Sequence, residues 1–531
     1  MKGVHGASGR RRVGSTAIFC AALLLNPAAC TSSAPDNQPT GTVPTPVTGA
    51  GAGAPASGGA GGALGMDPDA PAGGSTGTSG GVAPPPGGGT GGTSVVPTGG
   101  ASGMPEGGAV APPPGNTDWT MIGYDVGSTY FNRAETKLTK ENAANLQEVW
   151  TADMGGNVYG APLQIGDTIY ASGPGTVRAF NAAGMELWRK TFSSTASLAY
   201  ADGRLYLNTT SAQVVAINAE NGEMLWSKQP DTQRADGSSS PVVAGDVVLV
   251  GGSSGGIELS TGNFRGYLAA LNRMTGEVVW NTPTVPTTAK GASIWSTASA
   301  DVAAGRAYAS TGNNYGAPAT DTSDSIIAFD LATGAIIWKN QRTEGDTFSL
   351  GGTGPDFDFG ANPVLYETMV EGVMTQVVSA GAKSGAAHAV RRDDGMLLWT
   401  RNLCTGMANG SQGIFVNSTW TGKYMLFACN EGGPATLYAL DGATGAVAWM
   451  RPLEGLVWGR MSVANGVGFV GTGTKLEVFD VDTGTLIKTF PSKGGTVAGT
   501  ISISNGRVAY GEGLSWSTGV RGSTLTVLAV P

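Results

Sequence analysis

One phrase recurs along the chain and constrains its fold more than any other feature. It consists of an alternating apolar run, a short turn containing glycine, and a second apolar run that ends in tryptophan. The turn, written ENG, MTG, ATG, DDG or DTG, is typical of a β-hairpin. The copies are VRAFNAAGMELW, VVAINAENGEMLW, LAALNRMTGEVVW, IIAFDLATGAIIW, AHAVRRDDGMLLW, LYALDGATGAVAW and LEVFDVDTGTLIK. Their closing residues are Trp188, Trp226, Trp280, Trp338, Trp399, Trp449 and, as the exception, Lys488.

Two more β-rich runs precede each copy, as in PVVAGDVVLVGG, so each unit has about four strands, the blade of a β-propeller. After seven complete units the C-terminal stretch supplies only three strands. The run NLQEVWTADM, with Trp150, supplies a fourth from the other end of the chain. We therefore predict an all-β fold, an eight-bladed propeller over residues 118–531, whose N-terminal strand pairs with the C-terminal blade and closes the ring. The tryptophans are expected to pack between neighbouring sheets.

Residues 1–30 have the layout of a bacterial export signal. Three arginines, Arg10 to Arg12, precede the apolar run AIFCAALLL, and NPAAC follows. The small-small-cysteine ending resembles a lipoprotein cleavage box with Cys30 as the lipidated residue, although Pro27 stands where such boxes place leucine. A plain secretory signal is the alternative. The run is shorter than the ~20 residues that span a bilayer, so we expect an exported protein that reaches the membrane only through a lipid anchor. That anchor would lie in the outer membrane, with the protein facing the periplasm or the cell surface.

Residues 31–117 consist mainly of Gly, Pro, Ser, Thr and Ala, as in GAGAGAPASGGAGGALG. Such a segment buries too little apolar surface to offset the entropy of ordering, so we predict a disordered tether. A flexible chain of this length has a reach of about 50 Å. The propeller is thus expected to work well away from the membrane.

The charge and the cysteines limit the partners and the cofactors. The net charge is −8 and no basic patch is visible, which argues against nucleic acid as a partner. The chain has only two histidines and no C-x-x-C-H motif, which excludes covalently bound haem. Cys404 and Cys429 remain after the leader, and whether they form a disulfide is open.

The phrase A-x-D-x-x-T-G-x-x-x-W resembles the blade signature of quinoprotein (PQQ-dependent) alcohol dehydrogenases. The same blades build scaffold lipoproteins that bind no cofactor, so the function must come from residues outside the repeat. The likeness is greatest to the polyvinyl-alcohol dehydrogenase branch, which shares TGNN, D-T-S-D, G-P-D-F-D-F-G, A-K-S-G and the opening DWTMIGYD. It covers nearly the whole propeller.

Four stretches carry candidate site residues. GGSSGGIELSTGNFRGYL resembles the family segment whose glutamate binds calcium, which points to Glu258. The segment from IWST to TGNN resembles the one whose tryptophan lies under the quinone and whose asparagine binds the metal, here Trp295 and Asn313. PDFDFGANP resembles the loop that bears the catalytic base. SAGAKSGAAHAV resembles the strand whose lysine or arginine bonds the quinone oxygens, here Lys383.

The resemblance implies PQQ and Ca²⁺ as cofactors, and the residue types suit them. Glu258 and Asn313 offer the oxygen ligands that Ca²⁺ prefers. Trp295 offers a flat face to a planar cofactor, and Lys383 would stabilise charge on the reduced quinone oxygens. Asp358, between two phenylalanines, is the expected base, and Asp356 is expected to hold the loop or to contact the metal indirectly.

Each of these residues also has an ordinary structural interpretation. They would be a solvated loop carboxylate (Glu258), a turn residue (Asn313), one more core tryptophan (Trp295), a turn lysine (Lys383) and two caps of backbone amides (Asp356 and Asp358). His388 is expected to be structural.

The departures from the family matter as well. Adjacent cysteines are missing, and the haem domain of the polyvinyl-alcohol branch is replaced by the tether, so electrons would pass to a separate acceptor such as a cytochrome c. We expect a dehydrogenase that oxidises an alcohol, with polymeric and secondary alcohols among the candidates. The alternatives are a non-catalytic propeller lipoprotein that acts as a binding or assembly scaffold at the outer membrane, and a propeller that binds a carbohydrate or polymer without transforming it.

Overall fold

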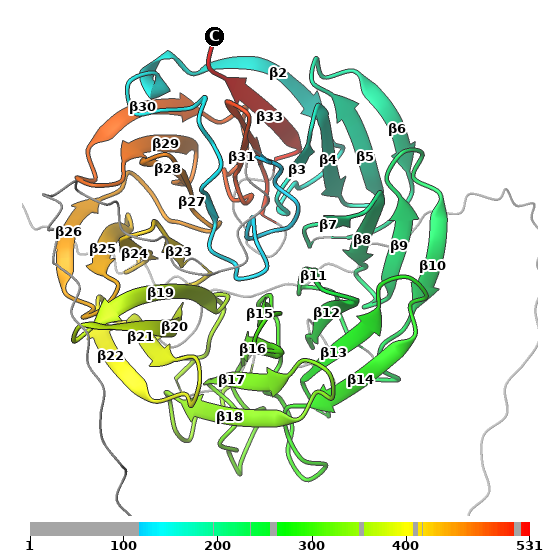
Figure 1. The fold of residues 1–531 in the computed structure, drawn as a ribbon, viewed down its shortest axis with the longest axis vertical. Coiled ribbons are helices and arrows are strands. Elements are labelled where there is room, and N and C mark those ends of the chain that lie inside the picture. The colour runs from blue at the N-terminus through cyan, green and yellow to red at the C-terminus, as the bar shows by residue number, and fades with distance from the viewer. Residues whose placement is uncertain are drawn as a thin grey trace, which may run out of the picture. The chain divides into compact units, whose positions relative to one another are not determined.

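A computed structural model describes residues 116–194, 196–233, 235–254, 263–349, 355–406, 412–416, 418–514 and 522–531. The predicted leader with Cys30 and nearly all of the predicted tether lie outside the described residues. What is described is a ring of antiparallel sheets, each with its strands following one another outward from the centre (Figure 1). The prediction of an eight-bladed propeller is confirmed.

The strands of the first four blades follow in chain order from the innermost to the outermost. They are β3 (Leu163–Ile165), β4 (Thr168–Gly173), β5 (Thr176–Asn181), β6 (Glu186–Lys190); β7 (Ala199–Ala201), β8 (Arg204–Asn208), β9 (Val214–Asn218), β10 (Met224–Lys228); β11 (Val242–Ala244), β12 (Val247–Gly252), β13 (Tyr267–Asn272), β14 (Val278–Pro283); β15 (Ser299–Asp301), β16 (Arg306–Ser310), β17 (Ser325–Asp330) and β18 (Ile336–Gln341).

The remaining blades continue the same order. They are β19 (Val364–Val370), β20 (Val373–Gly381), β21 (Ala386–Arg391), β22 (Leu397–Asn402); β23 (Thr419–Trp420), β24 (Tyr424–Cys429), β25 (Thr436–Asp441), β26 (Val447–Pro452); β27 (Ser462–Ala464), β28 (Val467–Gly471), β29 (Lys475–Asp480), β30 (Leu486–Pro491); and β31 (Ser502–Ser504), β32 (Arg507–Gly511), β33 (Thr524–Ala529).

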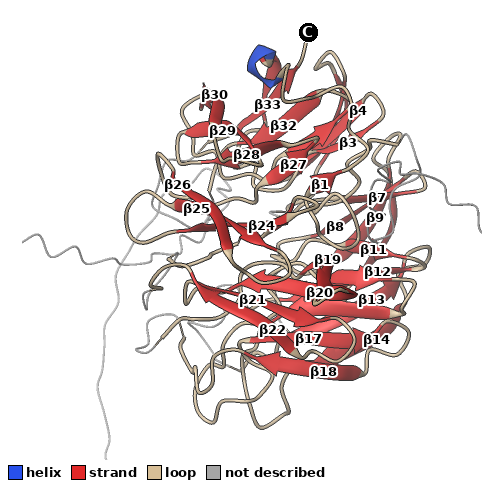
Figure 2. Ribbon diagram, turned by 60° about the vertical axis from the view of Figure 1, so that its left-hand side comes forward, coloured by secondary structure: helices blue, strands red, loops and turns tan. Residues whose placement is uncertain are grey.

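The ring closes as the sequence predicts. Strand β2 (Gln147–Asp153) pairs antiparallel with β33 and supplies the outer strand of the eighth blade. The described helical element is a short 3₁₀ turn, η1 (Ala143–Asn145), which lies at the rim of the ring (Figure 2). No helix in the described part of the chain is long and apolar enough to cross a membrane.

The blade-end tryptophans connect neighbouring blades. Each indole Nε1 donates to the carbonyl of the first residue after the third strand of the next blade, at 2.9–3.2 Å. The donor and acceptor pairs are Trp150 and Ala182, Trp188 and Ala219, Trp226 and Arg273, Trp280 and Leu331, Trp338 and Arg392, Trp399 and Gly442, and Trp449 and Val481.

The turn glycine of the repeat is required by the same packing. At Gly334 the φ angle is +74°, and a Cβ atom there would lie 2.5 Å from the Trp280 ring of the preceding blade. Only glycine combines this backbone conformation with so close an approach. The glycine and the tryptophan of the signature T-G-x-x-x-W are therefore both explained by the packing of one blade against the next.

Lys488 breaks the pattern for a reason that the fold makes plain. Its blade is followed by the eighth, where β33 and β2 come from opposite ends of the described chain and no hairpin turn joins them. The Lys488 ammonium instead donates to the carbonyls of Ala144 (2.9 Å) and Leu146 (2.5 Å), beside η1.

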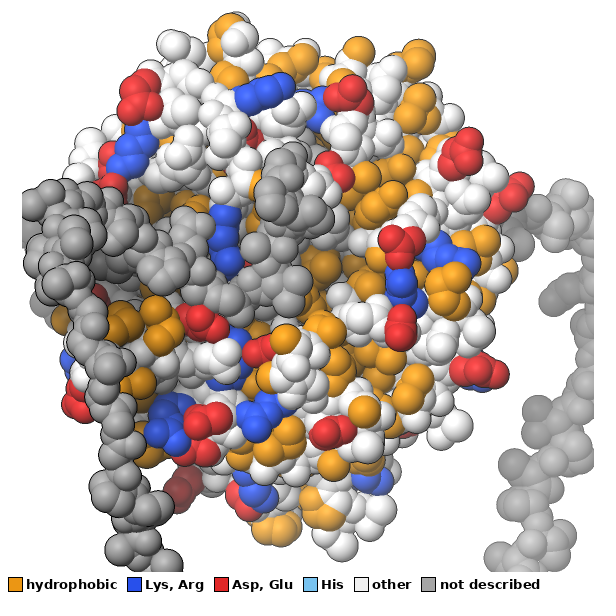
Figure 3. All heavy atoms as spheres, in the orientation of Figure 1, with side chains coloured by type: hydrophobic (Ala, Val, Ile, Leu, Met, Phe, Trp, Pro, Cys, Tyr) orange, Lys and Arg blue, Asp and Glu red, His pale blue; other side chains and the backbone are white. Residues whose placement is uncertain are grey.

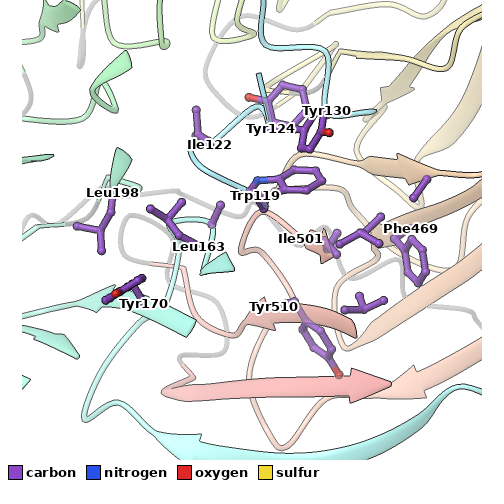
Figure 4. Packing of buried hydrophobic residues seen from close by; sticks show 14 of the residues in the cluster. Trp119, Ile122, Tyr124, Tyr130, Leu163, Tyr170, Leu198, Phe469, Ile501 and Tyr510 are labelled. Carbon is purple, nitrogen blue, oxygen red and sulfur yellow. The ribbon is translucent and has the colours of Figure 1, made fainter. Parts of the chain in front are cut away.

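Residues 117–140 pass across the centre of the ring in front of the innermost strands (Figure 1). They form backbone hydrogen bonds with most of these strands, including Tyr200 N to Thr120 O and Leu365 N to Gly127 O. β1 (Phe131–Asn132) adds to the seventh blade by parallel pairing with β27. Figure 4 shows Trp119 of this segment among the apolar side chains between the first and last blades.

This segment occupies one particular end of the ring. Its carboxylates accept hydrogen bonds from the turns that join the first and second strands of a blade. Gly166 N donates to Asp118 Oδ1 at 2.8 Å, and Gly506 N donates to Glu135 Oε2 at 3.0 Å. On the face seen in Figure 3, Lys and Arg side chains are interspersed with Asp and Glu. The opposite ends of the same strands carry the candidate site.

Candidate active site

The candidate residues come from loops at one end of two neighbouring blades. Trp295 lies just before β15 and Asp358 before β19, while Asn313 follows β16 and Lys383 follows β20. Because first and second strands of a blade are antiparallel, the start of one and the end of the other lie at the same end of the sheet. The structure therefore brings these loops together, as far as they are described.

Asp358 is held by two donors. Its Oδ2 accepts a hydrogen bond from the Trp295 indole Nε1 at 2.9 Å, and its Oδ1 lies 2.6 Å from the Lys383 ammonium. The backbone adds a third link, since Lys383 N donates to Asp358 O at 2.9 Å. The residue is 2% exposed. The carboxylate that the sequence offers as a base is thus oriented by both neighbours.

Lys383 is shared between two carboxylates. Its ammonium lies 2.8 Å from Asp356 Oδ1 as well as 2.6 Å from Asp358. Burial by itself would lower the pKa of Lys383, but the charges of Asp358 and Asp356 outweigh it and raise that pKa. Lys383 is therefore a buried cation in an ion-pair cluster and not a solvated turn lysine.

Asp356 has a different environment from that of Asp358. Burial, opposed by the Lys383 ammonium, raises the pKa of Asp356 to about 6. The cation that it contacts is Lys383, and the neighbouring Asp358 carboxyl group adds to the rise in its pKa. Asp356 thus contacts Lys383, and the loop-holding or indirect metal role expected for it stays a prediction.

Trp295 is half-buried, and it is not one of the tryptophans in the outer strands of the blades. Its ring packs against Phe415 with centroids 5.6 Å apart, and the Lys383 ammonium lies 4.9 Å from the ring centroid. Gly360 contacts the ring edge so closely that a Cβ there would lie 2.2 Å from Trp295. The ring is therefore fixed in place although part of it is accessible.

Asn313 is buried near the same cluster. Its Nδ2 donates to Phe348 O at 2.5 Å, so its Oδ1 points away from that carbonyl. Its φ angle is not positive, so an unusual backbone conformation does not account for the asparagine. Gly312, the preceding residue, lies next to Asp358, since a Cβ on it would be 3.1 Å from Oδ2. Glu258, the other expected metal ligand, lies outside the described residues.

His388 is buried beneath the loop. Its Nδ1 lies 3.1 Å from Thr400 Oγ1, and its ring packs edge-on against Phe359. Burial and the nearby Arg342 charge lower the pKa of His388 to about 3. A neutral imidazole packed in this way has a structural role.

Cys404 and Cys429 form a disulfide that joins the fifth and sixth blades. The chain beside it braces the Lys383 turn, since Leu403 N donates to Gly385 O at 2.9 Å and Gly406 N to Ser384 O at 3.0 Å. The pairing that the sequence left open thus supports the site loop.

Two buried aspartates near the site were not assigned from the sequence. Asp346 accepts from the backbone amides of Phe348 (3.0 Å) and Phe357 (2.9 Å), which ties the loop before Asp358. Asp324, in the D-T-S-D stretch, is fully buried, and neither of its carboxylate oxygens has a hydrogen-bond partner among the described residues. The D-T-S-D motif was the one sequence feature that could have drawn attention to Asp324, but a motif does not show that a side chain is buried.

The residues present suit a planar quinone and a hard cation. The Asp358 carboxylate accepts from the Trp295 indole N–H and pairs with the buried Lys383 ammonium, which lies 4.9 Å from the centroid of the indole ring. Buried carboxyl groups outnumber the single lysine of the cluster. Among the described residues, no group of three or more His, Cys, Asp or Glu side chains is close enough to hold a metal by itself. A cation there would also need amide oxygens such as Asn313 Oδ1.

The fold and the site define a propeller of the quinoprotein type, and the sequence comparisons agree. The chain belongs to the PQQ_2 family, whose model is described as outer membrane protein assembly factor BamB and matches residues 134–348, 260–419 and 383–528. The resemblance to quinoprotein alcohol dehydrogenases is confirmed.

Among the relatives are two polyvinylalcohol dehydrogenases. The one from a Pseudomonas species is 28% identical over 381 residues, covering 63% of this chain and 59% of the relative. The one from a Sphingopyxis species is 29% identical over 355 residues, covering 56% of this chain and 54% of the relative. The chain thus spans between half and three-fifths of the length of these curated relatives.

The solved structures show the same fold. Quinohemoprotein alcohol dehydrogenase from Comamonas testosteroni has a TM-score of 0.66 at 18% identity, covering 78% of this chain and 80% of that chain. BamB from Moraxella catarrhalis has a TM-score of 0.50 at 15% identity, covering 72% of this chain and 99% of that chain.

Proposed function

We propose that this protein is a PQQ-dependent dehydrogenase that oxidises an alcohol with the help of Ca²⁺. The observation that carries the proposal is the arrangement around Asp358, which meets Trp295 and Lys383 from two neighbouring blades. Dehydrogenases named for polyvinyl alcohol among the relatives support an alcohol substrate, secondary and polymeric alcohols included. Electrons leave to a separate acceptor such as a cytochrome c.

Each residue has a role that its geometry suits. Asp358 takes the proton of the alcohol hydroxyl, and the indole N–H of Trp295 holds the carboxylate toward the substrate. The ammonium of Lys383 would stabilise negative charge on the oxygens of the reduced quinone. Bound PQQ supplies the hydride acceptor, and Ca²⁺ supplies a Lewis acid. Asn313 and Glu258 hold the cation, and Trp295 holds the quinone plane.

Reconstitution tests this function. Purified full-length protein is incubated with PQQ and Ca²⁺, and both the absorption of bound quinone and the reduction of a dye are followed with primary, secondary and polymeric alcohols. We expect bound quinone and turnover in the wild type, and bound quinone without turnover in Asp358→Asn. Absence of both quinone binding and turnover in the wild type would overturn the proposal.

The alternative is a non-catalytic scaffold at the outer membrane. It is favoured by the description of the matching family model, an assembly factor of the outer membrane. A scaffold would bind no quinone and would be recovered from outer-membrane extracts with a stoichiometric protein partner. Quinone-dependent turnover by the purified chain would exclude it.

We also propose export and lipid anchoring through Cys30, on the basis of the leader-like residues 1–30. Radiolabelled palmitate should label the wild type and not Cys30→Ser. The variant should also move from the membrane fraction to the soluble fraction. Equal labelling of both proteins would contradict the anchor.

A further inference from the structure

Asp324 is a fully buried carboxyl group that the proposed mechanism does not use. Neither Oδ1 nor Oδ2 has a hydrogen-bond partner among the described residues, and the Ser323 hydroxyl next to it donates to Thr320 O at 3.0 Å. A buried polar group without a partner requires an explanation, such as an ion that neutralises it. An unpaired carboxylate in the interior is especially costly.

Asp324 lies in the wall of the candidate site. Its backbone N donates to Gly312 O at 3.1 Å, so it stands opposite the residue that precedes Asn313. Gly312 in turn faces Asp358, since a Cβ on it would lie 3.1 Å from Oδ2. Asp324 therefore lies beside the backbone that leads to the expected metal ligand, and its carboxyl group is close enough to Asp358 for their charges to interact.

The neighbouring charges make Asp324 harder to ionise without a cation. Burial raises its pKa well above the ordinary value, and the nearby carboxylates Asp346 and Asp358 raise it further. The one buried ammonium of the cluster, Lys383, is already taken by Asp356 and Asp358. Asp346 is satisfied by two backbone amides. Among the described residues, Asp324 has neither a hydrogen bond of normal geometry nor an ion pair, and the nearby Ser323 hydroxyl and the Lys383 charge offset only part of the rise in its pKa.

The backbone at Asp324 is unusual as well. Its φ angle is +52°, a conformation that L-residues rarely adopt outside Asn, Asp and Gly. The chain thus holds a buried carboxyl group in a left-handed backbone conformation that aspartate tolerates.

We propose that Asp324 is part of the cation site, and that its carboxylate supplies a negative charge to a divalent cation such as Ca²⁺ beside Asn313. The inference rests on the proposed function and extends it to a residue in the D-T-S-D stretch. Ca²⁺ takes several oxygen ligands and tolerates irregular geometry, so the Asp324 carboxylate and the Asn313 amide oxygen are ligand types that suit it.

The test measures binding of Ca²⁺ alone to the full-length protein after treatment with EDTA. Calorimetric titration compares the wild type with Asp324→Asn and Asp324→Gly, both of which tolerate a positive φ. We expect the Kd for Ca²⁺ to rise at least ~10-fold in both variants, a loss of about 1.4 kcal/mol.

Thermal unfolding provides a second readout, because the substitution should affect the melting temperature differently in EDTA and in Ca²⁺. In EDTA, Asp324→Asn should melt at the same temperature as the wild type or higher, because no buried carboxyl group is left that must either stay protonated or ionise without a partner. Added Ca²⁺ should raise the melting temperature of the wild type more than that of the variant. The control is Asp301→Asn, a buried carboxylate of the same blade that pairs with Arg392 at 2.8 Å. It should melt lower with and without Ca²⁺ and keep the wild-type Kd.

The outcomes separate this inference from the proposed function. An unchanged Kd in both Asp324 variants overturns the inference, and quinone-dependent turnover of the wild type would then leave the function intact. Loss of Ca²⁺ binding in the variants, together with a wild type that never binds quinone, supports the inference and overturns the function. A wild type that binds no Ca²⁺, with or without PQQ, overturns the inference.

Discussion

The indole Nε1 of Trp295 donates to Asp358 Oδ2 at 2.9 Å, across the boundary between the fourth and fifth blades. One bond thus fixes both the ring on which a planar cofactor would lie and the carboxylate that would take the proton. The opposite oxygen of Asp358 faces Lys383. The relative position of ring and base is therefore set by this bond, together with the Lys383 contact and the packing of the ring against Phe415.

Replacing Trp295 by Phe removes that donor and keeps a flat ring. A hydrogen bond to a charged group is worth about 1.5–3 kcal/mol, so we expect kcat to fall about 10- to 100-fold. Quinone absorption should persist at saturating PQQ. Steady-state kinetics on the reconstituted protein measures the change, and an unaltered kcat would show that the bond does not orient the base.

The propeller could be predicted because its signals are local and repeated. The hairpin turn, the glycine and the tryptophan recur in each unit, and each one reports a contact with the neighbouring blade, as Gly334 does with Trp280. Even the exception at Lys488 follows from the ring closure. The segment 117–140 was harder to predict, because its contacts, such as Asn132 Nδ2 to Ile503 O, join residues far apart in the sequence and follow no repeat.

In the site, too, some features could be predicted from the sequence and others could not. The resemblance identified Trp295, Asp358 and Lys383, which the structure brings into contact, but their roles stay predictions. The sequence did not reveal that Lys383 would bind both aspartates or that Asp324 would lack a partner, because burial and hydrogen bonding depend on the packed blades.

Lys383→Met should destabilise the fold. It leaves Asp356 and Asp358 buried without their cation, and breaking a buried pair in this way costs about 3–5 kcal/mol. Urea denaturation measures the free energy of unfolding. Lys339→Met is the matched control, because Lys339 pairs with Asp321 at the surface and should cost at most about 1 kcal/mol. Equal costs for the two variants would contradict a structural role for the Lys383 cluster.

Gly360→Ala should displace Trp295. The added Cβ would lie 2.2 Å from the ring and 2.3 Å from Phe415 O, and neither the packed ring nor the backbone can move freely. Overpacking of this kind costs about 1–3 kcal/mol, and we expect weaker binding of PQQ as well. Gly433→Ala, where no atom lies within 4 Å of the new Cβ, is the control and should be neutral. Similar stability and quinone affinity in both variants would mean that the Trp295 position is not fixed by Gly360.

The pH dependence of stability provides a test of Asp356. Burial raises the pKa of Asp356 from 3.8 to about 6 in the fold, so between these two values the folded protein holds more proton on this group than the unfolded chain does. Stability falls with rising pH wherever the native state binds more protons. The contribution of Asp356 should therefore decrease as the pH rises from about 4 to about 6 and stay level above that. Urea denaturation of the wild type and of Asp356→Asn at a series of pH values isolates this contribution, because the variant cannot titrate there. A wild-type advantage that instead grows from pH 4 to 6 would show that the Lys383 ion pair outweighs burial and lowers the pKa of Asp356.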